Sequence, residues 1–379
     1  MRRLWKAVFA VASFAAMSAV GRVAHAAPMD PAPDRFWLNN PNAPTGINCQ
    51  QIAQNPNIVL SPPFPSGATP NQYSCLPNNV AWANMMSELG MALAPTAFHP
   101  ARTTGFGGFA LSLEATFTSI NADASVTNKD GSTTQYWHVG TRGDVNPNTN
   151  AFSGVNKYPD SLLQVYTLKA RKGLPFGFEV AGALGYVANT SLWVGGADIH
   201  WSLLEGFRTG ILGYLPDLAI GGGVRTVGGS PDFFLTVVGI DAQVSKPLTL
   251  ADSSVLTPYV GAQRVIIFAD STVVNLTPTV DPLQQCGFQG NNPSTGEANC
   301  GNKLGNGLSN NGDFNNLTTF QKARIHRWRG LAGLTYKYEV LYLAGQFAMD
   351  VTDPGAENQN LGITGAKQWT MSFEAGVSF

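Results

Sequence analysis

The segment Ala197–Trp201 (ADIHW) places an acid and an imidazole two positions apart. Side chains alternate across a strand, so Asp198 and His200 would share one face, where the acid could orient the histidine as a base for water. The same two residues would equally serve as a hydrogen-bonded pair inside a fold. Because no nucleophile or second acid accompanies them at a defined spacing, we favour the structural interpretation.

Other residue types that could carry chemistry lack partners. His138 and His326 could be recruited for acyl transfer, but no serine stands at a defined spacing from either. Arg142–Asp144 (RGD) is a tripeptide that arises easily by chance, and the Asn/Asp-rich loops do not have the spacing of a calcium loop. There is no CxxC or Cys/His cluster and no glycine-rich phosphate loop. The sequence therefore predicts no enzyme, no metal and no cofactor.

The elements that would position the charged residues are strands. From Gly107 onward, ten segments alternate apolar and polar residues, and the composition, with 41 glycines and only 12% charged residues, suits many strands. Twelve strands remain an alternative. The polar faces carry both signs of charge, as a hydrogen-bonded barrel interior would need. The candidate lumen-lining residues are Glu114, Glu179, Asp198, His200, Arg225, Asp241, Arg327, Arg329 and Glu374.

The connections indicate how the strands are arranged. Those after the first, seventh and ninth segments are long (121–160, 271–319 and 352–367), whereas those after the second and eighth are short. Trp369 and Phe379 lie ten residues apart on one face, and ten residues in a tilted strand span roughly 25 Å, the height of a membrane's apolar band. We therefore expect an all-β fold, an antiparallel up-and-down transmembrane barrel over 101–379. Arg264 falls on its apolar side and would need a bulge, a register change or a place near the headgroups.

The first 26 residues read as a secretory signal peptide. Three cations precede an apolar run from Ala7 to Val20, and Ala24-His25-Ala26 forms a small-x-small cleavage site. The run is short for a membrane anchor. Cleavage would remove cations and no acid from a chain whose formal net charge is −1, so nucleic acid is not an expected partner.

Residues 27–100 form a Pro/Asn-rich segment. Four cysteines in an exported chain suggest two disulfides, and their order favours Cys49 with Cys75 and Cys286 with Cys300, although three pairings are open. One amphipathic helix is expected near 79–93, with Asn79 as its N-cap and one apolar stripe. The stripe packs either on the protein itself or on a membrane surface, and the segment either plugs the barrel or lies beneath it. The stripe consists of Trp82, Met85, Met86, Leu89 and Leu93.

The last strand resembles the C-terminal assembly signature of bacterial outer-membrane β-barrels, which combines alternating apolar residues with a final Phe. The matching residues are Trp369, Met371, Phe373, Ala375, Val377 and Phe379. This resemblance implies a cell outer membrane location, with outer-membrane lipid and the barrel assembly machinery as partners. The Asp198/His200 pair is similar to the Asp-x-His dyad of the omptin proteases, but the chain has no Asp-x-Asp to complete such a site.

Two functions follow from this expectation. Ten strands with facing charges indicate a narrow or plugged lumen, so our first hypothesis is a narrow pore or transporter for small solutes or ions. The alternative is a structural or surface-recognition barrel with a closed lumen that acts through its long loops. An omptin-like protease is a remote third.

Overall fold

The computed structural model describes only part of the chain. The described residues are 27–40, 49, 75–97, 100–144, 155–204, 215–251, 253–278, 288–294, 298–300 and 317–379. The predicted signal peptide lies outside them. Cys286 and the side chain of Cys300 lie outside them as well, and with them the predicted second disulfide. Cys49 and Cys75 form a disulfide.

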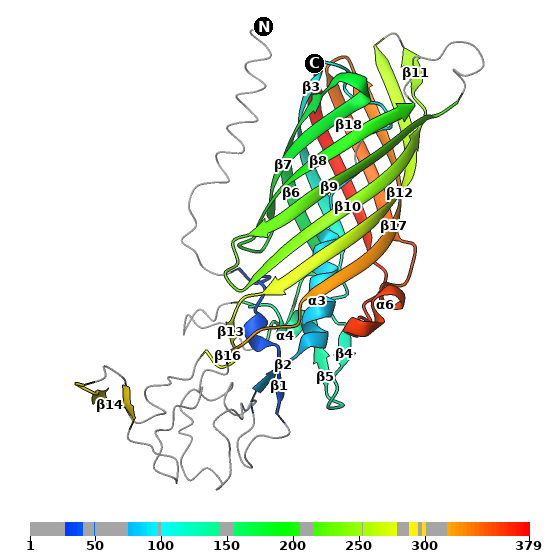
Figure 1. The fold of residues 1–379 in the computed structure, drawn as a ribbon. Helices are drawn as coiled ribbons and strands as arrows, with labels where there is room; N and C mark the ends of the chain where they lie inside the picture. The colour runs from blue at the N-terminus through cyan, green and yellow to red at the C-terminus, as the bar shows by residue number, and fades with distance from the viewer. Residues whose placement is uncertain are drawn as a thin grey trace.

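Ten antiparallel strands close into a barrel, the lower of the two predicted counts (Figure 1). Pairing follows the order β10-β9-β8-β7-β6-β3-β19-β18-β17-β12, and β12 pairs with β10 to complete the ring. The short strand β11 (Leu248–Ala251) extends β12 beyond the ring. The ten strands are β3 (Phe109–Ser119), β6 (Leu162–Gly173), β7 (Phe178–Val187), β8 (Trp193–Leu204), β9 (Asp217–Gly228), β10 (Phe233–Ser245), β12 (Ser254–Ser271), β17 (Ala323–Tyr338), β18 (Leu341–Asp350) and β19 (Trp369–Ser378).

The two ends of the barrel differ. One end, called the turn end, has the C-terminus and the connections 174–177, 205–216, 246–253 and 339–340, and it includes η2 (Pro175–Gly177). The other, called the loop end, has the long connections 120–161, 272–322 and 351–368. The loop end also carries the small elements β4 (Ser125–Thr127), β5 (Thr133–Gln135), α4 (Tyr136–Val139), β13 (Val274–Asn275), β14 (Phe288–Asn291), β15 (Ala298–Cys300), β16 (Leu317–Thr318), α6 (Pro354–Glu357) and η4 (Gln359–Leu361). The three long connections follow the first, seventh and ninth barrel strands, as predicted, whereas the connections after the third and fifth, 188–192 and 229–232, are short.

The first and last strands form the closing seam. β19 pairs with β3 in a register that sets Glu374 opposite Glu114. At the turn end, Phe109 N–H donates to Phe379 O at 2.7 Å and Phe379 N–H donates to Phe109 O at 2.9 Å, and the two rings stack with centroids 5.9 Å apart. The final phenylalanine therefore completes the seam.

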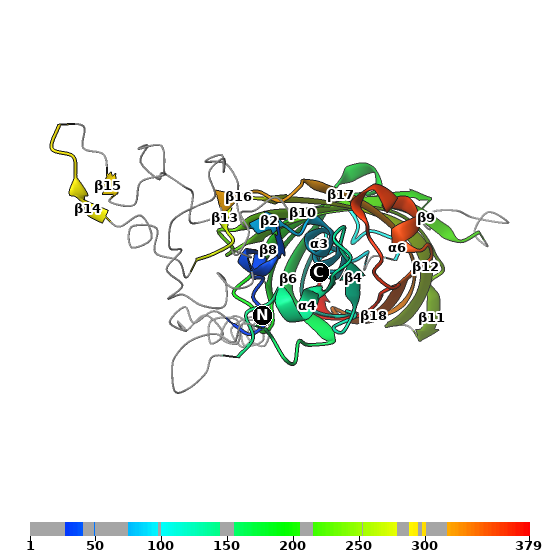
Figure 2. The same cartoon turned by 90° about the horizontal axis from the view of Figure 1, so that it is seen from below.

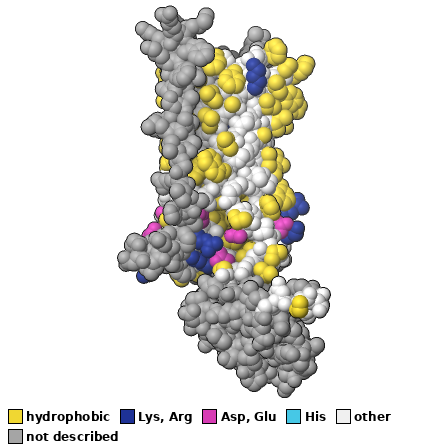
Figure 3. Space-filling view, turned by 90° about the vertical axis from the view of Figure 1, so that its left-hand side faces the viewer, with side chains coloured by type: hydrophobic (Ala, Val, Ile, Leu, Met, Phe, Trp, Pro, Cys, Tyr) yellow, Lys and Arg dark blue, Asp and Glu magenta, His cyan; other side chains and the backbone are white. Residues whose placement is uncertain are grey.

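The outer surface of the barrel is apolar and ends in aromatic residues. Figure 3 shows apolar side chains along one side of the barrel, with most charged side chains near the loop end. Contacting aromatic pairs lie toward both rims, for example Phe178 with Trp201 near the turn end and Tyr186 with Trp193 near the loop end. Trp193 is 48% exposed, which lipid, but not water, would accommodate at little cost. Apolar exterior and polar interior are the arrangement of a transmembrane barrel.

The N-terminal segment begins at the loop end and enters the barrel. Its first elements are η1 (Pro33–Arg35), β1 (Trp37–Asn39) and β2 (Cys75–Pro77), which pairs with β1. Helix α3 (Asn79–Ala92) follows and lies within the ring of strands when viewed from the loop end (Figure 2). Its N-cap is Asn78, whose Oδ1 accepts from Ala81 N–H at 3.1 Å, so the prediction of Asn79 was wrong by one residue. No helix in the described ranges is both long and apolar enough to cross a membrane.

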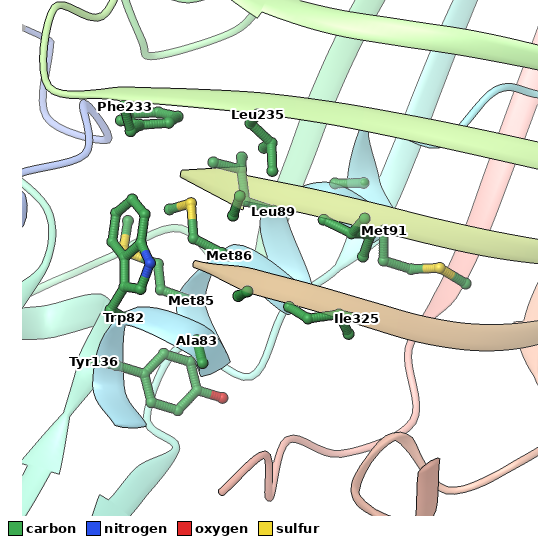
Figure 4. Packing of buried hydrophobic residues seen from close by; sticks show 14 of the residues in the cluster. Trp82, Ala83, Met85, Met86, Leu89, Met91, Tyr136, Phe233, Leu235 and Ile325 are labelled. Carbon is green, nitrogen blue, oxygen red and sulfur yellow. The ribbon is translucent and has the colours of Figure 1, made fainter. Parts of the chain in front are cut away.

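Helix α3 packs against inward-facing apolar residues of the loop half of the barrel. Trp82 stacks on Phe320 at 5.0 Å and meets Phe233 edge-on at 5.9 Å. Figure 4 shows Met86 and Leu89 of the helix beside Leu235 of β10. The predicted stripe thus packs on the protein itself and not on a membrane surface. The helix is buried on its polar side as well, where Asn84, Ser87 and Glu88 find hydrogen-bond partners.

Candidate functional site

The barrel interior is the candidate site, because the predicted charged residues converge there. All nine candidate lumen-lining residues are buried on the inward faces of their strands. They are Glu114, Glu179, Asp198, His200, Arg225, Asp241, Arg327, Arg329 and Glu374. The lumen-lining side chains form a series of layers along the barrel. In each layer they contact one another and the N-terminal segment.

One layer in the turn half of the barrel is built around Glu374. Its Oε1 lies 3.2 Å from Arg171 Nη2 and accepts from Tyr342 Oη at 2.8 Å. Arg171 also bonds to the Tyr342 hydroxyl and lies 3.9 Å from Glu179. Removing one member of such a buried ion pair leaves an uncompensated charge, so the layer is held as a unit.

The next layer joins the barrel to the segment that follows α3. Lys169 Nζ and Glu114 Oε2 are 2.7 Å apart, and both side chains are fully buried. Thr96 Oγ1 donates to Glu114 Oε1 at 2.8 Å, and Lys169 donates to Thr96 Oγ1 at 3.1 Å. The chain inside the lumen is therefore a member of the ion-pair network, not only a neighbour of it.

Glycines make room for this segment at the same depth. Arg225 binds Asp198 through two nitrogens, at 2.7 and 2.8 Å. A Cβ at inward-facing Gly223 would lie 2.0 Å from Asp198 Oδ1 and 3.0 Å from the Cβ of Pro95. The glycine run of β9 thus allows close approach of the Asp198–Arg225 pair and the lumenal segment.

The carbonyl of Pro95, just beyond the helix, accepts two donors from the barrel. Arg329 Nη2 donates to Pro95 O at 2.6 Å and Gln263 Nε2 donates to it at 3.1 Å. Arg329 Nε also donates to Gln263 Oε1 at 2.6 Å. The Pro95 carbonyl lies beyond the end of the helix and is buried. The side chains of Arg329 and Gln263 supply the hydrogen bonds that it needs.

At the loop half, Arg327 ties α3 to the barrel. It pairs with Asp350, and its Nη1 donates to the Ser87 carbonyl at 3.2 Å. Gln368 N–H donates to Asp350 Oδ2 at 2.8 Å, and Gln368 Oε1 accepts from Arg327 Nη1 at 2.5 Å. These contacts connect the helix to two strands and to the long connection before β19.

Toward the turn end, the chain leaves the interior after the buried Ala101 and crosses the rim, where Phe106 is 82% exposed, before β3 begins. Ala101 N–H donates to Ser245 Oγ at 2.9 Å, and Arg102 Nε lies 2.7 Å from Asp217 Oδ2. Thr104 N–H donates to Glu179 Oε2 at 2.8 Å. The described parts of the segment, α3 with 93–97 and 100–108, thus contact the lumen wall at every level.

Little space is left around the Asp198/His200 pair. One cavity, of about 10 Å³, is lined by Pro95–Ala97 together with Asp198, His200 and Asp241. A volume of this size is close to the minimum for one water molecule. His200 lies beside Glu179, Asp241 and the backbone of Ala101, while Asp198 is bound by Arg225.

Beyond the strand ends, Glu88 of α3 attaches the helix to the first long connection. Tyr136 Oη donates to Glu88 Oε1 at 2.5 Å, Trp137 Nε1 donates to Oε2 at 2.8 Å, and Asn121 N–H donates to Oε2 at 3.1 Å. Burial raises the pKa of Glu88, and these donors and Arg327 oppose the increase.

Several residues of the network were not among the predicted candidates. Their signals were present but weak, since a polar residue on an inward face has no charge to draw attention to it. Gln263 and Tyr342 fall on inward faces by alternation, whereas Thr96 and Pro95 lie in a segment without any period. The uncharged residues that were missed and that contact the lumenal segment or its partners are Pro95, Thr96, Ser112, Gln263, Tyr342 and Gln368. The network also includes the charged side chains of Lys169, Arg171 and Asp350, which alternation likewise places on the polar faces.

Comparison with known proteins identifies no close relative. No family model and no curated protein matches the sequence. Among solved structures, the chain is similar to the attachment invasion locus protein Ail of Yersinia pestis, with 11% identity, 72% of this chain and 99% of that chain covered, and a TM-score of 0.23. Neisserial surface protein A is 10% identical, with 72% of this chain and 97% of that chain covered and a TM-score of 0.23. The outer membrane protease OmpT of Escherichia coli is 10% identical, with 72% of this chain and 96% of that chain covered and a TM-score of 0.20.

These similarities are too low to assign any activity to this chain. The class of protein follows from its own architecture, a closed antiparallel barrel with an apolar exterior, aromatic residues toward both rims and a polar interior. The chain is an outer-membrane β-barrel protein.

Proposed function

We propose that this protein is a closed-lumen barrel that acts at the cell surface through its N-terminal segment and long loops. The observation that carries the proposal is the occupation of the lumen by α3 and the residues between it and β3, which are bonded to the barrel wall at successive levels. Such a filled interior favours the closed-barrel alternative over a permanently open pore. Passage of a solute would require displacement of a segment that Glu114, Arg327 and Arg329 hold.

The orientation of the barrel gives the proposal its direction. In outer-membrane barrels, short turns and the C-terminus face the periplasm and long loops face outward. Applied here, the turn end is periplasmic and the loop end is exposed on the cell. Because the lumenal segment runs from the loop end to β3 at the turn end, the residues before α3 would lie outside the cell.

The surface at the loop end is already held in place by contacts within the protein, before any partner binds. Arg35 Nη1 donates to the Thr141 carbonyl at 2.7 Å, and Arg142 pairs with Asp34 at 2.9 Å. Ser191 N–H and Oγ both donate to Asp30 Oδ1. Contacts of this kind reduce the ordering cost of binding, which suits recognition of a partner. They also hold Arg142–Asp144, so its RGD tripeptide is part of a structured region.

A catalytic role for Asp198 and His200 is not part of the proposal. Proteolysis would need the acid to orient the histidine next to space for a peptide. Asp198 is instead engaged by Arg225, and the adjoining cavity would hold at most one water molecule.

Two measurements on the full-length protein test the proposal. In planar lipid bilayers, the folded protein should be silent under an applied voltage, and steady ion-selective current would overturn the closed lumen. On intact cells, a membrane-impermeant thiol reagent should label a cysteine introduced at Asn40, whereas one introduced at Phe176 should react only after the outer membrane is permeabilised. The reverse pattern would overturn the orientation.

A further inference from the structure

Three cationic or basic side chains face outward on β12 and β17 near the loop end, where the strands otherwise present apolar residues to lipid. In the β12–β17 register, Arg264 lies opposite Trp328, and Arg324 lies opposite Phe268. His326 lies between them, opposite Ile266. The register is continuous through this region, so neither a bulge nor a shift accounts for the outward position of Arg264.

The two arginines have no anionic partner in the described part of the chain. The guanidinium carbon of Arg264 lies 5.3 Å from the centroid of the Trp328 ring, and that of Arg324 lies 5.4 Å from the centroid of the Phe268 ring. Nε of Arg264 and Nδ1 of His326 are buried without a hydrogen-bond partner among the described residues. Lys322, nearby on the same strand edge, differs because it pairs with Asp270 at 2.6 Å.

The depth of these side chains places them at the membrane surface. Trp328 and Trp369 lie near the loop-end limit of the apolar exterior, which puts Arg264 at the level of the aromatic residues. Arg324 is four residues closer to the loop end, and four residues of a strand tilted by about 40° rise roughly 10 Å. The cluster therefore extends from the edge of the hydrocarbon into the layer occupied by lipid headgroups.

We propose that Arg264, Arg324 and His326 bind the phosphate-bearing headgroup of an outer-leaflet lipid. Guanidinium groups bind phosphate through paired hydrogen bonds, and stacking on aromatic rings leaves their N–H edges free to do so. The acidic groups nearby do not neutralise the two arginines. Asp270 pairs with Lys322, and Glu357 of α6 interacts electrostatically with His326. The site rests on the orientation proposed above.

The test measures binding of lipid A with two phosphates to the purified full-length protein in detergent, by titration in native mass spectrometry. Relative to wild type, the double variant Arg264→Gln/Arg324→Gln should bind about tenfold more weakly or worse, because two charge-assisted contacts are lost. The matched control is Lys172→Gln, which removes an exposed cation at the turn end and should bind as wild type does. Heat-modifiable migration verifies that each variant is folded.

Further measurements separate the contributions of the arginines and of the lipid phosphates to the affinity. Arg324→Gln alone, at an exposed position, should weaken binding without affecting folding. Lipid A stripped of its phosphates should bind the wild type as weakly as intact lipid A binds the double variant. Equal binding of both lipids, or equal binding by wild type and double variant, would overturn the site. Displacement of the lipid by equimolar inorganic phosphate would also overturn it, as an adventitious anion site only. The closed-lumen proposal is unaffected by any of these outcomes, because it is tested by conductance.

Discussion

Gly223 shows how a single missing side chain shapes the lumen. It faces inward from β9, and the space that a Cβ would need is taken by Asp198 and Pro95. A glycine in a strand usually weakens it, through lost packing and greater freedom of the unfolded chain. Here the position allows an ion pair and the lumenal segment to approach the same point of the wall.

Substitution of Gly223 by valine should therefore destabilise the protein by about 1–3 kcal/mol, the usual cost of overpacking. The measurement is the urea midpoint of the folded, heat-modifiable band in lipid vesicles. Gly195→Val is the matched control, because a Cβ there meets nothing within 4 Å. Equal midpoints for the two variants would mean that the contact between Pro95 and the wall is not needed.

Glu88 gives the attachment of α3 a dependence on pH. Burial raises its pKa above the unfolded value, so the folded state favours the protonated form. The contribution of Glu88 to stability is thus complete below the unfolded pKa of about 4.3 and is lost as pH rises through the folded pKa. Glutamine imitates the protonated acid at every pH. We expect Glu88→Gln to match wild type in unfolding free energy near pH 4 and to become the more stable protein as the pH approaches about 8. A difference that does not change with pH would contradict this account.

At the scale of elements, helix α3 fills the loop half of the barrel and provides its apolar core. Strand pairing alone leaves the inward residues Phe233, Leu235 and Ile325 without cover, and α3 covers them (Figure 4). The helix also ends at the point where the interior becomes polar, next to Arg329 and Gln263. The helix therefore occupies the apolar loop half of the lumen, and the chain after it occupies the polar half.

Trp82→Ala should lower the free energy of unfolding by about 3–5 kcal/mol, since it removes a buried ring that contacts Phe233 and Phe320. Urea unfolding in lipid vesicles, followed by tryptophan fluorescence, measures the loss. Trp193→Ala serves as control, because Trp193 faces lipid and is 48% exposed. If both substitutions cost the same, α3 does not stabilise the barrel from inside.

At the scale of the whole molecule, the closed sheet predicts resistance to detergent. A ring without sheet edges leaves no unpaired backbone for dodecyl sulfate to attack at low temperature. Unboiled protein should therefore migrate on a detergent gel differently from boiled protein. Identical migration, together with recovery in the soluble periplasm, would contradict the membrane barrel.

The barrel could be predicted from the sequence because its signal is local. Alternation with a period of two assigns each side chain to a face, and it assigned Glu114, Arg225 and Arg329 to the interior without knowledge of their partners. The outward position of Arg264 follows from the same rule, whereas its depth required the assembled barrel. The path of the N-terminal segment could not be predicted, because contacts such as that of Thr96 with Glu114 depend on the closed ring and leave no period in a Pro/Asn-rich stretch.

The seam between β3 and β19 has a consequence for the order of folding. The residues that lie inside the ring are continuous with β3, one side of that seam. If the ring closed first, Trp82 and the disulfide-linked chain before it would have to be threaded through a finished opening. A sheet that is still open can instead curl around the segment, and pairing of β19 with β3 then completes the enclosure. We therefore expect docking of the N-terminal segment to precede closure, and variants that weaken this docking to accumulate as unclosed sheets during assembly.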